Sequence, residues 1–167
     1  MHRRHLLSAG ASLLGFLGAS RLAGAKTQEG AQESFEVTKT EAEWRAGLTP
    51  AAYNVLREHG TERAGTSPLN REKRTGTFAC AGCELPLFSS ETKFESGTGW
   101  PSFYKPLDNA VSTNTDRAYG MTRTEVHCRR CGGHLGHVFD DGPRPTGLRY
   151  CMNGVALRFT ATEPSRS

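Results

Sequence analysis

The sequence lacks the features that mark repetitive, membrane-spanning or strongly charged proteins. It has no low-complexity tract, no internal repeat beyond two Cys-x-x-Cys pairs, and no run of about 20 apolar residues. Its first 25 residues hold three arginines and no acid, so the 21 basic and 17 acidic residues of the chain leave 18 against 17 in the rest. This near balance argues against an extended nucleic-acid interface. A length of 167 residues is most simply one domain with a real core.

The N-terminal segment has the layout of an export signal. A basic start is followed by an apolar stretch (about residues 6–19) and by the small residues Ala-Gly-Ala. The paired Arg3 and Arg4 resemble a twin-arginine signal. A membrane anchor is the alternative, but the stretch is short for a span and rich in Gly and Ser. We therefore expect 1–25 to be a twin-arginine-type signal peptide that is cleaved.

The mature protein is expected to begin with a flexible leader over 26–38, whose first half is polar and without periodicity. Export by the twin-arginine route places it in the periplasm. No cysteine in the signal segment offers a site for a lipid. We expect no stable membrane association after the signal is removed.

Two short helices are expected after the leader. Thr40 is placed to cap the first, with a glutamate three residues later at the capping-box position. Pro50 opens the second, where its missing N–H costs nothing, and Gly60 is expected to end it. Tyr53 and Leu56 have the spacing of a buried stripe on this second helix.

From residue 76 onward the pattern changes to short apolar runs separated by Gly, Pro, Asn and Asp. This alternation is typical of a compact, mainly β domain made of antiparallel strands with many turns. We expect strands in five segments: 77–79, 85–88, 135–139, 148–151 and 155–159.

Four of the five cysteines predict a metal site. They form two pairs, Cys80 with Cys83 and Cys128 with Cys131, separated by 44 residues. Each pair can aim two thiolates at one point, and two pairs complete the tetrahedral shell that zinc favours. A closed shell of four thiolates leaves no open position, so we expect one structural zinc ion that clips together two distant segments.

Two other interpretations of these cysteines were weighed. Exported cysteines usually form disulfides, which would make the chain a disulfide-bonded structural protein. A thioredoxin-type redox motif is the second, but that motif occurs singly at the start of a helix. The twin-arginine route carries folded proteins, so zinc can be bound in the reducing cytoplasm before export. Zinc is therefore favoured over disulfides.

The fifth cysteine, Cys151, has no partner three residues away. If its segment is a strand, Arg149, Cys151 and Asn153 share one face. A nearby cation favours the reactive thiolate, and Asn153 can hydrogen-bond a polar oxygen beside it. A buried, inert core cysteine is the alternative, but arginine and asparagine are poor core residues. The pattern favours a reactive thiol.

Two further segments carry candidate site residues. His134 and His137 are free to deliver protons, because the four cysteines already saturate a zinc ion. An ideal strand would point them to opposite faces, so a shared site requires a bend, which Gly136 could supply. Asp141 could orient an imidazole or lie in a solvated turn. Trp100, between Gly and Pro, could wall an apolar pocket or fill the core.

Taken together, these motifs resemble those of the B-type methionine sulfoxide reductases. The resemblance runs from about residue 40 to 160 and includes both cysteine pairs. Four other stretches carry it: Thr61-Glu62-Arg63, the segment 96–103 (SGTGWPSF), the segment 134–141 (HLGHVFDD) and the segment 149–153 (RYCMN). Several motifs in fixed order are far more specific than any one alone. The family fold implied is a pair of antiparallel sheets with short N-terminal helices, here over 39–163.

The resemblance implies a role for each candidate residue in reducing the R epimer of methionine sulfoxide in oxidised proteins. Cys151 would attack the sulfoxide sulfur, His134 and His137 would handle the proton, and Trp100 would hold the S-methyl group. Three more residues would support the site: Asp141, Arg149 and Asn153.

One departure from the family pattern concerns recycling. Many members carry a second redox cysteine where this chain has Thr98. We therefore expect an external thiol, such as a thioredoxin-like partner, to reduce the Cys151 sulfenic acid. The chain is expected to act as a monomer. The alternative from another class is a zinc-ribbon-like binding module in which Cys151 is inert.

Overall fold

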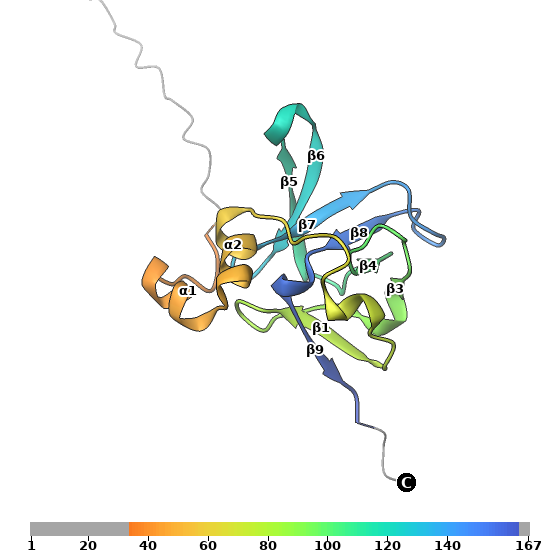
Figure 1. Ribbon diagram of the computed structural model, residues 1–167, viewed down its shortest axis with the longest axis horizontal. Helices are drawn as coiled ribbons and strands as arrows, with labels where there is room; N and C mark the ends of the chain where they lie inside the picture. Colours follow the sequence, from red (N-terminus) through yellow and green to blue (C-terminus); the bar gives the residue numbers. More distant parts are fainter. Residues whose placement is uncertain (1–33, 164–167) are drawn as a thin grey trace, which may run out of the picture. The chain divides into compact units, whose positions relative to one another are not determined.

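A computed structural model describes residues 34–163 of the chain (Figure 1). The predicted signal peptide and the first residues of the predicted leader lie outside this part. Within it, the expectation of a mainly β fold is confirmed. Two short helices come first in the chain and two antiparallel sheets follow, and all of them contribute to one core.

Both helices form where their caps predict them. The first, α1 (Glu41–Gly47), has a complete capping box at Thr40, and α2 (Pro50–Glu58) is capped by Thr49. The prediction that Gly60 ends α2 was wrong by one residue, because His59 already takes the left-handed conformation at φ 55°. Among residues 34–163, no helix is long and apolar enough to cross a membrane.

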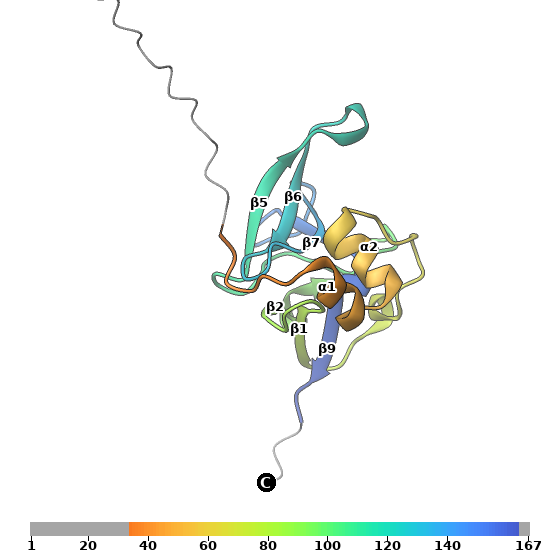
Figure 2. The same cartoon turned by 90° about the vertical axis from the view of Figure 1, so that its left-hand side faces the viewer.

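The smaller sheet has three strands in the order β2–β1–β9. Its central strand is β1 (Gly76–Cys80), paired with β2 (Pro86–Ser89) on one edge and β9 (Leu157–Ala161) on the other. Figure 2 shows these three strands together beside the two helices. The apolar segment predicted over 155–159 divides into a 3₁₀ turn and the first part of β9.

The larger sheet has six strands in the order β3–β4–β8–β7–β6–β5. Its central strands are β7 (His134–Phe139) and β8 (Arg149–Met152), both near their predicted positions. Four strands were not predicted: β3 (Lys93–Phe94), β4 (Ser102–Phe103), β5 (Val111–Asp116) and β6 (Arg123–Cys128). The hairpin of β5 and β6 extends beyond the neighbouring strands in Figures 1 and 2.

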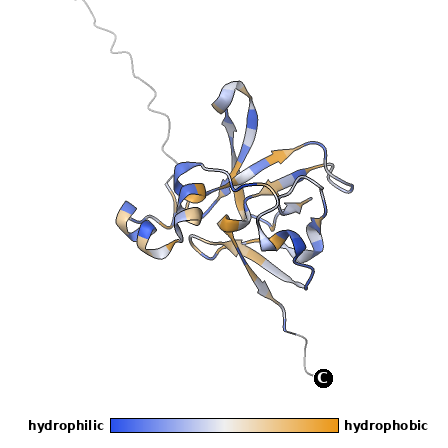
Figure 3. Cartoon of the chain, in the orientation of Figure 1, coloured by the Kyte–Doolittle hydropathy of each residue, from blue (hydrophilic) through white to orange (hydrophobic). Residues whose placement is uncertain are grey.

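Aromatic side chains join the two sheets. Phe88 from the smaller sheet stacks on Phe103 from the larger one at a ring-centroid distance of 4.4 Å, and Phe78 meets Phe103 edge-on at 4.9 Å. All three are fully buried. Leu56 of α2, predicted to be buried, is 2% exposed. Figure 3 shows apolar colours where α2 and the strands meet, and α2 packs against β7.

Candidate active site and metal centre

Cys151 lies in the middle of the larger sheet. It sits on β8 between β7 and β4, where its backbone is paired with His137 on one side and Ser102 on the other. Its thiol is free and half-buried. Arg149 acts electrostatically on this thiol, whereas Met152, one residue on, is fully buried in the core. The predicted alternation of faces along this strand is therefore observed.

A pocket of about 120 Å³ opens beside Cys151. Its walls mix aromatic and polar side chains from segments that are far apart in the sequence. The lining residues are Thr61, Trp100, Arg123, Gly136, His137, Phe139, Cys151 and Asn153. The structure thus brings four of the predicted site residues to one small cavity. Three others, His134, Arg149 and Asp141, lie outside its lining.

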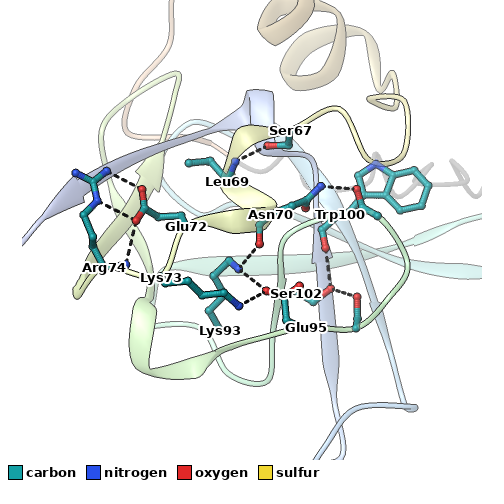
Figure 4. Close-up of polar contacts among 12 residues, drawn as sticks. Ser67, Leu69, Asn70, Glu72, Lys73, Arg74, Lys93, Glu95, Trp100 and Ser102 are labelled. Atoms are coloured by element: carbon teal, nitrogen blue, oxygen red, sulfur yellow. Dashed lines mark hydrogen bonds and ion pairs between the residues drawn. The ribbon is translucent and has the colours of Figure 1, made fainter.

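Trp100 is a pocket wall held from behind by hydrogen bonds. Its indole N–H donates to the carbonyl of Glu62 at 2.9 Å. The preceding residue, Gly99, accepts from the side chain of Asn70 at 2.9 Å, and Lys93 donates to the Asn70 carbonyl at 2.9 Å (Figure 4). Gly99 has φ 95°, a conformation that strains other residues. These contacts favour the pocket role for Trp100 over a core plug.

A β-bulge brings the two histidines together. On β6, Val126 and His127 are adjacent, but their partners on β7 are Gly136 and His134, so β7 has one extra residue between them. The rings of His134 and His137 consequently lie 5.4 Å apart, edge to face. The expected bend is therefore present, with Leu135, the residue before Gly136, as the extra residue of β7.

Each of these two histidines is paired with a carboxylate. His137 Nε2 lies 2.8 Å from Asp116, which also accepts from Arg123 at 2.6 Å. His134 Nδ1 lies 2.7 Å from Glu125. Burial lowers the pKa of His137, and the hydrogen bond to Asp116 opposes this shift only in part. These contacts fix the orientation of both rings.

The positive charge of Arg149 lowers the pKa of the Cys151 thiol less than the sequence suggests. Arg149 donates two hydrogen bonds to Asp141, both of 2.8 Å, and stacks over Phe139 at 4.4 Å. Burial raises the pKa of the Cys151 thiol, while Thr98 and Arg149 lower it by smaller amounts. The expected effect of a neighbouring cation is therefore present but outweighed. Asp141 therefore orients the Arg149 guanidinium rather than an imidazole.

A chain of hydroxyl groups leads to the thiol. Ser102 is fully buried and lies 2.7 Å from Ser96, which lies 2.8 Å from Thr98. The Thr98 hydroxyl is 3.9 Å from the Cys151 sulfur. Thr98 therefore lies next to the thiol, within hydrogen-bonding distance of it.

Asn153 ties the loop at Glu62 and strand β7 to the pocket. Its side-chain oxygen accepts from the backbone of Glu62 at 2.8 Å, and its amide donates to Leu135 at 3.0 Å. The Glu62 carboxylate in turn accepts from Gly154 at 2.6 Å. Glu62 thus contacts Trp100, Asn153 and Gly154, and it holds the wall of the pocket against the end of β8.

Sequence reasoning missed several residues that shape the site: Glu62, Asp116, Arg123 and Glu125. The last three lie on β5 and β6, strands that the apolar-run pattern did not detect. The alternation in Thr-Glu-Val-His-Cys (124–128) is the signal that could have found β6. Glu62 gave a weaker signal, as one member of the motif Thr61-Glu62-Arg63.

The four paired cysteines converge as predicted. Cys80 and Cys131 have their sulfurs 3.7 Å apart, and those of Cys83 and Cys128 are 3.5 Å apart. All four sulfurs lie within 4.8 Å of one another, and each is a free thiol. Zinc–sulfur bonds of about 2.3 Å in a tetrahedron separate the sulfurs by about 3.8 Å. The cluster therefore fits a zinc ion.

The two cysteine turns share one backbone geometry. In the first turn, Glu84 has φ 63° and its N–H donates to the carbonyl of Cys80 at 2.8 Å. In the second turn, Gly132 has φ 66° and its N–H donates to the carbonyl of Cys128 at 2.8 Å. Cys80 ends β1 of the smaller sheet, and Cys128 ends β6 of the larger one. A metal ion held here would join the two sheets.

Comparison with known proteins gives one consistent result. A family model described as the SelR domain matches residues 48–161. The peptide methionine sulfoxide reductase MsrB of Leptospira interrogans is 54% identical over 127 residues, or 75% of this chain and 97% of its own length. That of Pseudomonas putida is 58% identical over 125 residues, covering 74% and 94%. The chloroplastic peptide methionine sulfoxide reductase B1 of Arabidopsis thaliana is 50% identical over 140 residues, covering 83% and 69%. The chain therefore belongs to the SelR-domain family of B-type methionine sulfoxide reductases.

Proposed function

We propose that this protein reduces methionine sulfoxide in proteins to methionine, acting on the R epimer with Cys151 as the nucleophile. The observation that carries the proposal is the position of a free, half-buried thiol in a small pocket opposite His137 and beside Trp100. An inert core cysteine would not line a cavity with polar neighbours. Family membership supports the same chemistry.

The net reaction transfers one oxygen atom from the substrate sulfur to the enzyme sulfur. The Cys151 thiolate attacks the sulfoxide sulfur and forms a sulfur–sulfur bond, while the sulfoxide oxygen takes up protons and leaves as water. Water then attacks the Cys151 sulfur, and the sulfur–sulfur bond breaks with its electron pair going to the methionine sulfur. The products are methionine and a sulfenic acid on Cys151, so the thiol is oxidised by two electrons as the substrate is reduced. His137, which lines the pocket, is the proposed proton donor, and His134 lies behind it.

Epimer selection follows from the shape of the pocket. Its volume, about 120 Å³, admits the end of a methionine sulfoxide side chain, and Trp100 with Phe139 supplies the apolar part of its wall. If the S-methyl group lies against Trp100, only one epimer can present its sulfur to Cys151 and its oxygen to His137.

Recycling is proposed to depend on an external thiol. The chain has five cysteines, and four lie together in the metal cluster. Next to Cys151 stands Thr98, which cannot form a disulfide. A thiol from outside would convert the sulfenic acid to a mixed disulfide, releasing water, and a second thiol would restore Cys151. A thioredoxin-like protein with an exposed dithiol suits this role.

Location and metal content complete the proposal. The Arg-Arg pair and apolar stretch of residues 1–25 support export to the periplasm by the twin-arginine route. The cysteine cluster supports one structural zinc ion. A repair enzyme in that compartment would act on exported proteins that meet oxidants there.

The decisive experiment uses the two epimers of a blocked methionine sulfoxide with dithiothreitol as reductant. We expect the native protein to reduce the R epimer alone and the Cys151→Ser variant to reduce neither. A zinc assay and a thermal melt on both proteins check that the substitution leaves the fold intact. Reduction of the S epimer alone, or full activity without Cys151, would refute the proposal.

A further inference from the structure

Behind the proposed active site, three side chains from separate elements meet at one point. His59 caps α2, Glu125 lies on β6 and His134 begins β7. His59 Nδ1 is 3.1 Å and His134 Nδ1 is 2.7 Å from the same oxygen of Glu125, and the two imidazole rings are 5.2 Å apart. Two imidazoles and a carboxylate are a ligand set that zinc and nickel bind in proteins.

We propose that His59, Glu125 and His134 form a second metal site, distinct from the four cysteines, that takes Zn²⁺ or a similar transition-metal ion from solution. Tetrahedral ligands with bonds of about 2.1 Å lie about 3.4 Å apart. The donor atoms of the three residues all lie within 4.8 Å of one another, so small side-chain rotations bring them into this geometry. Three protein ligands leave the fourth position for water.

The three proposed ligands differ in how much of each side chain is exposed to solvent. The side chain of His134 is 3% exposed and that of Glu125 is 11% exposed, whereas His59 is 65% exposed. An ion can therefore enter from the His59 side and meet ligands that are already held by the sheet.

The backbone holds His59 at this position. His59 has φ 55°, and its N–H donates to Asn54 as the cap of α2. Non-glycine residues in this conformation carry a cost of about 1 kcal/mol or more, although histidine and asparagine tolerate it better than most. The cap thus fixes the backbone of His59 at the end of α2, within side-chain reach of Glu125.

An ion at this site would act on the proposed reaction, and this step rests on the proposed function. Coordination by His134 would replace its hydrogen bond to Glu125, and the His134 ring packs against His137. His137 lines the pocket that holds Cys151. We therefore expect metal occupancy to lower turnover, which makes the site inhibitory.

Binding is tested by calorimetric titration of Zn²⁺ into the full chain after the cysteine cluster has been loaded with one equivalent. The background is Cys151→Ser, so that this thiol cannot coordinate the ion. We expect one further equivalent to bind, and His59→Asn to weaken that binding by about tenfold or more. Asparagine keeps the left-handed cap while removing the imidazole. Glu58→Gln, the neighbouring exposed acid, is the matched control and should bind normally.

His2 and His5 are common to every protein in the titration, so they contribute equally to each curve. Absence of a further binding event, or equal affinity in His59→Asn, would overturn the metal site. Inhibition is measured separately with Cys151 present, using an R-sulfoxide assay across the same Zn²⁺ concentrations. The zinc concentration for half-inhibition should rise in His59→Asn by the same factor as its dissociation constant.

These two measurements separate the metal site from the proposed function. A protein that binds the further zinc ion but never reduces sulfoxide keeps the site and loses the function. An active protein with no such binding keeps the function and loses the site. Without added metal, His59→Asn should reduce the sulfoxide at nearly the native rate, because His59 lies outside the pocket lining.

Discussion

The four-cysteine cluster and the Cys151 pocket use the same side chain in contrasting surroundings. In the cluster, three of the four cysteines are fully buried, and each sulfur has other sulfurs as neighbours. In the pocket, one half-buried sulfur has a hydroxyl, a guanidinium and a cavity beside it. A thiol surrounded by thiols is saturated by a metal ion, whereas a thiol with an open side remains free to react.

The largest effect on the fold is expected from breaking the cluster. Cys128→Ser removes a fully buried sulfur at the point where the two sheets meet, and it leaves three thiolates without a complete shell. We expect loss of bound zinc and destabilisation by more than about 4 kcal/mol, since loss of a metal is among the most disruptive substitutions. Cys151→Ser is the matched control. It should keep the zinc and the melting temperature while losing activity.

On the pocket side, His137→Asn should reduce kcat/KM for the R-sulfoxide by about 100-fold, the usual contribution of a general acid. The matched control is His59→Asn, because it removes an exposed imidazole that lies outside the pocket lining. His127→Asn is unsuitable as a control because that ring is buried in the fold. A His137→Asn rate within twofold of native would remove His137 from the proton step.

The dependence of kcat/KM on pH sharpens the role of His137. The active form needs Cys151 as the thiolate and His137 as the imidazolium. As pH rises, the thiolate fraction increases and the imidazolium fraction decreases, so the product of the two fractions is constant between the two pKa values and falls on either side. Burial lowers the pKa of His137 and raises that of Cys151, which predicts a broad plateau. Asp116→Asn removes a contribution that raises the His137 pKa, so the acid limb should move to lower pH. Arg123→Gln should move it to higher pH.

A smaller effect is expected at the wall of the pocket. Trp100→Ala removes the apolar surface proposed to hold the S-methyl group, worth about 1.5 kcal/mol or roughly tenfold in kcat/KM. Trp100→Phe keeps a wall and loses only the hydrogen bond to Glu62, so it should cost less. Equal rates for both variants and the native protein would show that Trp100 does not contact the substrate.

The smallest effect is expected at Thr98. Thr98→Val removes the hydroxyl that lowers the Cys151 pKa, while Thr98→Ser keeps it. A hydrogen bond worth about 0.5–1 kcal/mol corresponds to a two- to fivefold change in the thiolate fraction. The rate of alkylation of Cys151 by iodoacetamide at pH 8 should fall by that factor in Thr98→Val alone. An unchanged rate would assign Thr98 no part in activating the thiol.

Much of both regions could be predicted from local sequence signals. The spacing of the cysteines is enough to predict the cluster, because a Cys-x-x-Cys turn has one geometry wherever it occurs. The caps at Thr40 and Thr49 position the helices, since capping depends on residues only three apart. The motif around Cys151 predicted its strand and the face shared with Arg149.

What the sequence did not reveal depends on contacts between distant segments. β5 has mostly polar side chains and exposed positions, so it carries no apolar run, and its pairing with β6 is what places Asp116 beside His137. The bulge near Gly136 appears only when β7 is aligned with β6. The direction of the Cys151 pKa shift likewise could not be predicted from sequence, because it depends on how deeply the folded chain buries the thiol. Burial raises this pKa by more than the charge of Arg149 lowers it.

The pairing of β1 with β9 has a consequence for how the protein is made. β1 holds Cys80 and lies early in the domain, whereas its neighbour β9 extends to Ala161. During synthesis one edge of β1 therefore stays open until nearly all of the domain has left the ribosome, and an open edge is a site for pairing with other chains. Early binding of zinc by the cysteine turns, available once Cys131 has emerged, would anchor β1 to β6 during that interval. A truncation before residue 157 should accordingly leave a zinc-binding but aggregation-prone chain.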